Sequence, residues 1–288
     1  MANGSPGSSA SVVSTAPAAV RQAVQQGIVR VRRTIEQTNI SALADAYTKM
    51  HGRQEGDNRG WLFWAEYHGY NRFDCWHHSS VGSQSFPYDL FLPWHRAYLL
   101  LFERTVVAAN SGAVLPWWDW TSAASHATGI PAAFQSTSAL SSGPVPRGLR
   151  TNPPRTRRQP GSPSALPSAA KIESILDLTT FDDFSNQVQN QHDSVHGWVG
   201  GDMGVVARSS FDPIFWSHHC MIDRLWYLWQ VRHGVDNIPP SYLNRTLAPF
   251  PLRVKDVLEI RQLGYSYGGT RLRLAADAFT TTVLDPTS

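Results

Sequence analysis

Residues 212–226 read DPIFWSHHCMIDRLW, and no other stretch of the chain says as much about the fold. Asp212 and Pro213 are typical of the N-cap and the first turn of a helix, and the helical pattern continues beyond the stretch. Large apolar side chains flank His218 and His219. Because an imidazole in an apolar lining is costly unless it is bonded to a partner or a metal, this pair indicates a metal site or a hydrogen-bonding site on a buried helix.

A second pair of histidines lies upstream, in the stretch HDSVHGWVGG at 192–201. His192 and His196 are four residues apart, so on a helix both rings project from one face about one turn apart. Two ligands of one metal ion need this geometry. Such a pair alone is often a surface feature, but its occurrence together with His218 and His219 favours a metal site.

Three further imidazole donors lie in the N-terminal half, each beside an aromatic residue. They are His68, either His77 or His78, and His95. Two groups of three imidazoles leave coordination positions open, and they suit copper, zinc, iron or nickel better than magnesium or calcium. Apart from Asp212 at the helix N-cap, the only carboxylates in the histidine motifs are Asp193 and Asp223, which argues against a carboxylate-bridged di-iron centre.

The rest of the chain favours a mainly helical single domain. Apolar residues recur at three- and four-residue steps between Pro17 and Met50, which predicts two amphipathic helices separated near Asn39. Residues 1–16 are expected to be disordered, and 121–168, a proline-rich region, is expected to be a long irregular surface segment. Other predicted elements are helices at 61–68, from Pro93, from Ile172 and at 181–195, and a strand or buried turn at 114–120.

Composition fits a soluble globular protein, since 42% of the 288 residues are hydrophobic and 16% are charged. No apolar run approaches the ~20 residues of a membrane helix, so no membrane partner is expected. The net charge of +3 includes five arginines between Pro144 and Ala170, and without them it would be 3 − 5 = −2. This acid-free segment is interpreted as a solvated loop, and no nucleic-acid partner is expected. Without a signal peptide in the first twenty residues, a cytoplasmic location is the default expectation, and secretion is expected if a leader was removed.

Three segments resemble the copper-binding signatures of tyrosinases and related type 3 copper proteins. They are FLPWHRAYL at 91–99, HDSVHGWVGG at 192–201 and DPIFWSHHCMIDRLW at 212–226. Tyr265 and Tyr267 also resemble the tyrosine motif that closes the family's catalytic domain, and Arg30, Arg32 or Arg33 resembles the N-terminal arginine that packs near it. The resemblance implies a catalytic domain at 17–288, a four-helix bundle around a dinuclear copper site, long irregular loops and no C-terminal lid domain.

The resemblance also assigns the metal ligands. His68, His77 and His95 match the ligands of the first copper, and His192, His196 and His219 match those of the second. Asp223, one turn beyond His219, is expected to orient that ring as a hydrogen-bond acceptor. Cys75, two residues before His77, resembles the thioether-linked partner of fungal members, and a buried thiol is the alternative. The gap of eighteen residues between His77 and His95 is about twice the usual one, which implies an inserted loop at 79–88.

Five residues near the predicted ligands are candidates for a direct part in the reaction: three would position the substrate, and Asp193 and Gln189 are the catalytic candidates. The resemblance places Val206 at the gate over the second copper, Phe215 at the pocket wall and Gly197 at an open entrance. Asp193 and Gln189 stand where many hydroxylating members carry an Asn and a Glu around a water molecule. An anionic Asp193 is therefore a candidate for the base that deprotonates a phenol.

The activity that the resemblance implies is the oxidation of catechols to o-quinones, with two copper ions as cofactor and O2 as co-substrate. The substrate is expected to be a small phenol, and ortho-hydroxylation of monophenols is expected as well. The alternatives are a catechol oxidase or an o-aminophenol oxidase without monophenolase activity, an O2 carrier similar to molluscan haemocyanin, and a zinc-loaded relative without redox activity. The oligomeric state and the need for a copper-loading chaperone stay open.

Overall fold

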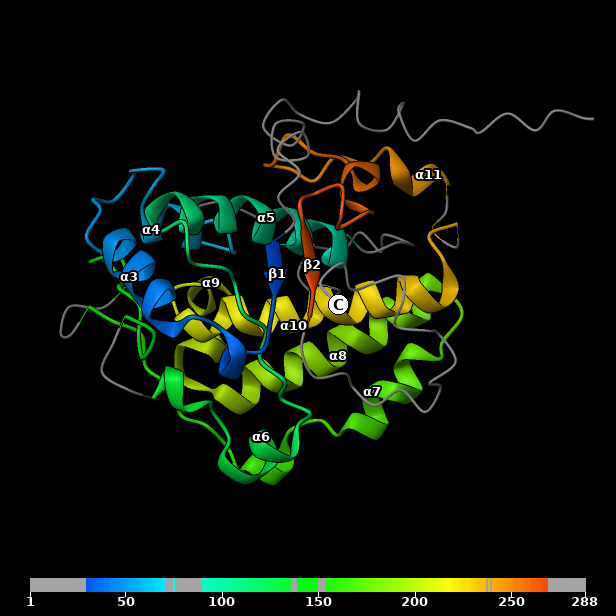
Figure 1. Cartoon of the computed structure of the whole chain (residues 1–288), viewed down its shortest axis with the longest axis horizontal. Coiled ribbons are helices and arrows are strands. Elements are labelled where there is room, and N and C mark those ends of the chain that lie inside the picture. The colour runs from blue at the N-terminus through cyan, green and yellow to red at the C-terminus, as the bar shows by residue number, and fades with distance from the viewer. Residues whose placement is uncertain are drawn as a thin grey trace, which may run out of the picture.

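The computed structural model describes residues 30–70, 75, 90–135, 139–149, 154–236, 238 and 240–268. The described part is mainly helical (Figure 1). Its helices are α3 (Ile40–His51), α4 (Trp61–Ala65), α5 (Phe91–Ala109), α6 (Ala123–Thr128), α7 (Ala169–Leu176), α8 (Phe181–Val199), α9 (Val206–Ser209), α10 (Pro213–His233) and α11 (Pro240–Leu243). Short 3₁₀ turns occur at Ile35–Gln37, Ala132–Phe134, Pro163–Ala165, Gly201–Gly204 and Val254–Val257, and the strands are β1 (Arg30–Arg32) and β2 (Tyr265–Tyr267).

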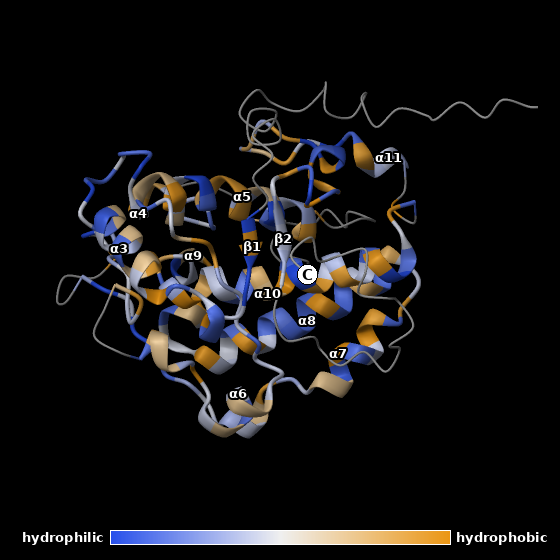
Figure 2. Cartoon of the chain, in the orientation of Figure 1, coloured by the Kyte–Doolittle hydropathy of each residue, from blue (hydrophilic) through white to orange (hydrophobic). Residues whose placement is uncertain are grey.

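Helix α10 is the centre of a bundle that also contains α3, α5 and α8. It contacts α5 and α8, and α3 in turn contacts α5 (Figure 1). All residues at 213–226 are buried, so the helix has no solvent-facing side over its first four turns. Hydrophilic residues interrupt the apolar ones along α8 and α10 (Figure 2), and several of them, including Gln189 and Asp223, are buried. The predicted mainly helical bundle is confirmed.

The start of α10 follows the predicted capping chemistry. The side chain of Asp212 accepts a hydrogen bond from the backbone N–H of Ile214 (3.1 Å), and Pro213 occupies the first turn. Arg158 forms three hydrogen bonds with the carboxylate of Asp212, at 2.5 to 2.9 Å. This arginine belongs to the basic segment for which the sequence predicts a solvated loop. For Arg158 that interpretation is wrong, because the side chain anchors the N-terminus of a buried helix.

Residues 30–37 form a strand and a 3₁₀ turn, so the helix predicted through Ile35 is wrong where the structure describes it. Strand β1 pairs in parallel with β2, with Arg30 opposite Tyr265 and Arg32 opposite Tyr267. The reason is non-local: a partner strand more than 230 residues away satisfies the backbone of β1, and periodicity in the sequence does not reveal that partner. Residues 1–16 and the rest of the first predicted helix lie outside the described residues.

A buried cluster of charges connects these strands to α5 and α10. Arg32 forms an ion pair with Glu103 (2.8 Å), and its guanidinium carbon lies 3.8 Å from the ring centroid of Tyr265. Among the three arginines that resemble the family's N-terminal arginine, Arg32 is therefore the one that packs on the tyrosine motif. Asp223 accepts hydrogen bonds from the guanidinium groups of Arg32 (3.2 Å) and Arg96 (2.5 Å), both of which are buried.

The remaining differences concern element boundaries. Helix α5 begins at Phe91 rather than at Pro93, and α4 ends at Ala65, before the predicted residue 68. The segment 114–120 contributes a single bridge, between Thr34 and Trp117, and is otherwise irregular. No helix within the described residues is long and apolar enough to cross a membrane.

Candidate metal centre

The bundle brings five of the six predicted ligands together, from four parts of the fold. They are His68 in the turn after α4, His95 on α5, His192 and His196 on α8, and His219 on α10. All five are at least nine-tenths buried. The sixth predicted ligand, His77, and its alternative, His78, lie outside the described residues. Cys75 is described and buried, and its thioether bond to His77 stays a prediction.

Hydrogen bonds to Nδ1 set the orientation of four of these rings. His68 Nδ1 lies 3.0 Å from the carbonyl oxygen of Val206, and His95 Nδ1 lies 2.8 Å from that of Phe91. On α8, His196 Nδ1 lies 2.7 Å from the carbonyl oxygen of Met203, and His192 Nδ1 lies 2.9 Å from Asp193 Oδ1. Because each of these oxygens can only accept, Nδ1 of a neutral ring carries the proton and Nε2 carries the lone pair. These lone pairs are what a metal ion requires.

The Nε2 atoms of three histidines converge at the second predicted site. His219 Nε2 lies 3.1 Å from His192 Nε2 and 3.2 Å from His196 Nε2. A proton on His219 Nε2 can satisfy only one of these two neighbours fully. A metal ion satisfies all three, since nitrogen ligands about 2.0–2.1 Å from one tetrahedral ion lie roughly 3.3 Å apart. The residues present therefore fit a metal ion with three imidazole ligands.

The first predicted site adjoins the second through His219. Ring nitrogens of His68, His95 and His219 lie within 4.8 Å of one another, as do those of His192, His196, His218 and His219. The rings of His95 and His219 are stacked, with centroids 4.5 Å apart and planes inclined by 19°. The two groups of imidazoles thus form one continuous cluster in the core, which suits a dinuclear centre.

Burial favours the neutral form of His196, His218 and His219. Desolvation lowers the pKa of His196 to about 4, an effect that the hydrogen bond to the Met203 carbonyl only partly offsets. Desolvation also holds the pKa values of His218 and His219 well below 6.5, and the neighbouring histidines add to this. Neutral imidazoles at pH 7 are ready to bind a metal without first releasing protons.

His218 lies beside the second group and is not one of the predicted ligands. Its ring is fully buried and stacks on that of His192, with centroids 5.1 Å apart and planes inclined by 16°. The Nε2 of the neighbouring His219, in contrast, meets the Nε2 atoms of both α8 histidines. The distances thus support the choice of His219 over His218, because adjacent residues on a helix point in different directions.

Asp223 does not orient His219, so this prediction is wrong. Besides the two arginines, the Asp223 carboxylate accepts hydrogen bonds from the hydroxyl groups of Tyr265 (2.7 Å) and Tyr267 (2.6 Å). Two buried guanidinium groups attract a carboxylate more strongly than a neutral imidazole does. This explains why the Asp223 carboxylate binds the arginines and not His219. The pKa of Asp223 is lowered because the attraction of Arg96 and Arg32 outweighs the opposing effect of burial.

The predicted substrate-contacting residues surround the cluster. Phe215 is buried, with its ring centroid 4.1 Å from that of His219 and 4.7 Å from that of His68. Gly197 is exposed, and a side chain at this position would meet no atom within 4 Å. The side chain of Val206 is 47% exposed on α9, the short helix whose first carbonyl orients His68. Phe215 therefore packs directly on the histidine cluster, whereas the other two residues lie at the surface, and the contact of all three with a substrate stays a prediction.

Asp193 and Gln189 both lie on α8, but in different surroundings. Gln189 is fully buried. The Asp193 side chain is 49% exposed, and its Oδ1 accepts the hydrogen bond from His192. The structure thus gives Asp193 a part in orienting a predicted ligand, which the sequence did not indicate. The sequence also missed the carbonyl groups of Phe91, Met203 and Val206, and no side-chain pattern could have revealed them.

These features define a helical-bundle protein whose core contains a continuous cluster of imidazoles that could hold metal ions. The profile of the common central domain of tyrosinase matches residues 45–154 and 141–232. A tyrosinase from Streptomyces antibioticus is 34% identical over 200 residues, which cover 56% of this chain and 72% of the relative. The chain belongs to the tyrosinase family of type 3 copper proteins.

Solved structures agree on the fold. A functional unit of octopus hemocyanin superposes with a TM-score of 0.68 at 24% identity, covering 83% of this chain and 68% of that one. A tyrosinase from Burkholderia thailandensis superposes with a TM-score of 0.66 at 22% identity, covering 83% and 74% respectively. The same bundle is therefore present both in a hemocyanin and in a tyrosinase, so the fold alone does not select between them.

Proposed function

We propose that this copper oxidoreductase uses O2 to oxidise catechols to o-quinones and also hydroxylates monophenols at the ortho position. The observation that carries the proposal is the continuous cluster of buried, neutral imidazoles in which His219 belongs to both metal-ligating groups. In the first reaction two catechols and one O2 give two quinones and two waters. In the second, one monophenol and one O2 give one quinone and one water.

The positions of the histidines suggest which of them would hold each of two copper ions. His68 and His95, together with the predicted His77, would hold one ion, and His192, His196 and His219 would hold the other. Copper bound in this way supplies the electron transfer between the phenol and O2. The protein itself contributes four ligands whose Nδ1 atoms are already held by acceptors, namely His68, His95, His192 and His196, and an apolar surrounding that limits the access of water.

A small phenolic substrate is proposed to approach from the side of Gly197 and Val206. The ring of Phe215 is buried against both ligand groups, so it would contact an aromatic substrate that reaches the cluster. The open space beside Gly197 admits a substituent on the phenol. In this proposal Val206, exposed on α9, is the residue that contacts the substituent at the entrance.

The proton of a monophenol has to be removed before the ring is hydroxylated, and Asp193 is the proposed base. It is an acid beside a predicted ligand, and its half-exposed position places it at the boundary of the cluster. Gln189, buried on the same helix, is proposed to act with Asp193 on a bound water molecule.

A diphenol oxidase or an o-aminophenol oxidase without monophenolase activity is the second candidate. The observation that favours it is the hydrogen bond between Asp193 Oδ1 and His192 Nδ1. A carboxylate committed to a ligand is a weaker base for the substrate, since the hydrogen bond stabilises its charge. Catechols are more readily oxidised than monophenols, so their oxidation depends less on such a base.

The test is oxygen uptake by the copper-reconstituted protein with catechol, tyrosine and an o-aminophenol. We expect uptake and quinone formation with catechol and tyrosine, and two copper ions per chain. His219→Ala should lose catechol turnover and lower the copper content, whereas His126→Ala, a histidine on α6 outside the cluster, should change neither. Reversible O2 binding without consumption of catechol would instead indicate an O2 carrier, and full activity of His219→Ala would show that the site is misassigned.

A further inference from the structure

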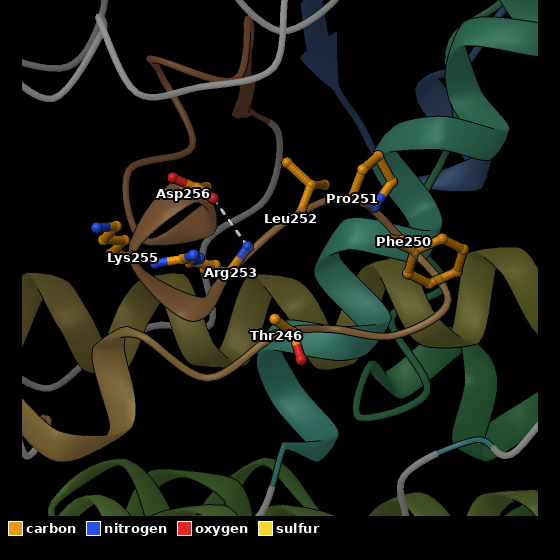
Figure 3. Close-up of a pocket in the computed structure, with 7 residues that line it drawn as sticks. All are labelled: Thr246, Phe250, Pro251, Leu252, Arg253, Lys255 and Asp256. Carbon is orange, nitrogen blue, oxygen red and sulfur yellow. Dashed lines mark hydrogen bonds between the residues drawn. The ribbon is translucent and has the colours of Figure 1, made fainter.

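A pocket of about 400 Å³ lies in the loop that follows α11, and neither the predicted metal ligands nor the predicted substrate contacts line it (Figure 3). Its volume is within the range of ~300–1,000 Å³ that is typical of sites for small molecules. Its lining consists of Thr246, Phe250, Pro251, Leu252, Arg253, Lys255 and Asp256.

The backbone of this loop is fixed by hydrogen bonds and by a contact with α5. The N–H of Leu247 donates to the carbonyl of Leu252 (2.8 Å), and the N–H of Val254 donates to that of Arg245 (3.1 Å). The indole Nε1 of Trp94 on α5 donates to the carbonyl of Ala248 (2.8 Å). The pocket is therefore part of the ordered structure, anchored to one of the bundle helices.

The pocket has a charged side and an aromatic side (Figure 3). The side chains of Arg253, Lys255 and Asp256 lie on one side, and the rings of Pro251 and Phe250 lie on the other. The ring of Phe250 is held in place, because it packs on Trp94 with centroids 5.2 Å apart. The ring is only 5% exposed, so the part of it that lines the pocket offers a small, fixed apolar contact to a ligand.

The charges of the pocket do not cancel. Asp256 Oδ2 accepts a hydrogen bond from the backbone N–H of Arg253 (2.8 Å), so the one carboxylate in the lining is engaged by the backbone. No ion pair of the described residues involves the guanidinium of Arg253 or the ammonium of Lys255. The pocket thus presents two cations against one anion, next to an aromatic ring.

We propose that this pocket binds a small aromatic carboxylate, with the carboxylate on Arg253 and Lys255 and the aromatic ring against Phe250. Arginine provides two parallel donors to a carboxylate, and lysine adds a point charge. The ring of Trp94 lies between this pocket and the metal centre, since it contacts both Phe250 and His95 (centroids 4.8 Å apart). The site is therefore separate from the metal centre, and the proposal does not depend on catechol oxidation.

The experiment is calorimetric titration of the copper-loaded protein with 3-phenylpropionate at constant ionic strength. Its neutral amide and inorganic phosphate serve as comparison ligands. Arg253→Gln and Lys255→Gln should each raise the Kd of the carboxylate about tenfold, the loss expected for one charge-assisted contact. Lys171→Gln, which removes one positive charge from an exposed position on α7, is the matched control and should leave the Kd unchanged.

The comparison ligands test the two halves of the proposal separately. We expect the amide to bind at least tenfold more weakly than the carboxylate, and phosphate to bind at least tenfold more weakly as well, because it lacks the ring. An unchanged Kd in the double variant Arg253→Gln/Lys255→Gln would overturn the proposal, since the carboxylate would then bind elsewhere, for example at copper. Phosphate binding as tight as that of 3-phenylpropionate would overturn the aromatic part.

Discussion

Replacing Asp223 by asparagine tests the buried charge cluster that joins β1, α5, α10 and β2. The substitution keeps the shape of the side chain but removes its charge. The carboxylate of Asp223 lies 2.5 Å from Arg96 Nε and 3.2 Å from Arg32 Nη1, and it accepts two tyrosine hydroxyl groups. An asparagine presents one carbonyl oxygen and an NH2 group to these donors, so at least one donor would face another donor.

The expected cost follows from burial. At an effective dielectric constant of ~20, each guanidinium within about 4 Å of the carboxylate contributes roughly 4 kcal/mol of attraction. Desolvation of the ions consumes most of this energy when the cluster forms. Removing the charge of Asp223 takes the compensating carboxylate away from the desolvated Arg96 and leaves Arg32 with Glu103. Breaking a buried pair in this way costs about 3–5 kcal/mol. Since a whole domain is stable by only about 5–15 kcal/mol, Asp223→Asn should remove a large share of the free energy of unfolding.

The assay is urea-induced unfolding of the copper-free protein, followed by tryptophan fluorescence. Copper is left out because a bound ion would add stability by mass action. Asp177→Asn is the matched control: Asp177 Oδ1 also accepts from an arginine, Arg232, at 2.6 Å, but the side chain is 70% exposed. A surface pair of this kind contributes about 0–1 kcal/mol. Equal losses in the two variants would refute the reasoning, because the buried cluster would then stabilise the fold no more than a surface ion pair.

Three further changes test the site and its surroundings. Asp193→Asn should lower kcat/KM for tyrosine relative to catechol by on the order of 10²-fold, with copper content unchanged, and an unaltered ratio would exclude Asp193 from proton transfer. Burial lowers the pKa of His51 to about 3. As the pH falls below 6.5, the His51 ring therefore takes up a proton in the unfolded chain but not in the folded one, and the free energy of unfolding decreases until about pH 3. His51→Phe should flatten the pH dependence of urea unfolding by up to about 5 kcal/mol over this range, and an unchanged pH dependence would contradict the role of this buried ring. Gly197→Ala should stabilise α8 by roughly 0.5–1 kcal/mol in the same unfolding assay, because the added methyl group meets no neighbour; a destabilised variant would contradict the open geometry at this position.

Local chemistry made part of this structure predictable from the sequence. The N-terminus of α10 depends on Asp212 and Pro213 alone, and the approach of His192 to His196 depends on the helical repeat alone. Both predictions are confirmed, because neither needs information from outside the segment. The convergence of His219 with the α8 histidines has no local signature, and only the resemblance to the type 3 copper family predicted it.

Features that depend on distant partners were not predictable in this way. Strand β1 has a helical periodicity in its sequence, and only pairing with β2 makes it a strand. Asp223 follows His219 by one helical turn, which suggested a contact between them, but Arg32 and Arg96 arrive from β1 and α5 and attract its carboxylate instead. The carbonyl groups that orient the histidines belong to the backbone, which leaves no trace in residue type.

Buried ionic contacts hold helix α10 in place both before and after His219, so they fix the position of this predicted ligand. Asp212 is fixed by Arg158 at the N-terminus of the helix, and Asp223, four residues after His219, is fixed by Arg96. The position of His219 is thus set by contacts that involve no metal, and hydrogen bonds set the orientation of the α8 rings in the same way. When folding itself prepares the ligands, the free energy of metal binding is not consumed in ordering them. Because His219 belongs to both groups of converging imidazoles, a shift of α10 would disturb both groups together, so the anchors of this helix matter to the whole cluster rather than to one half of it.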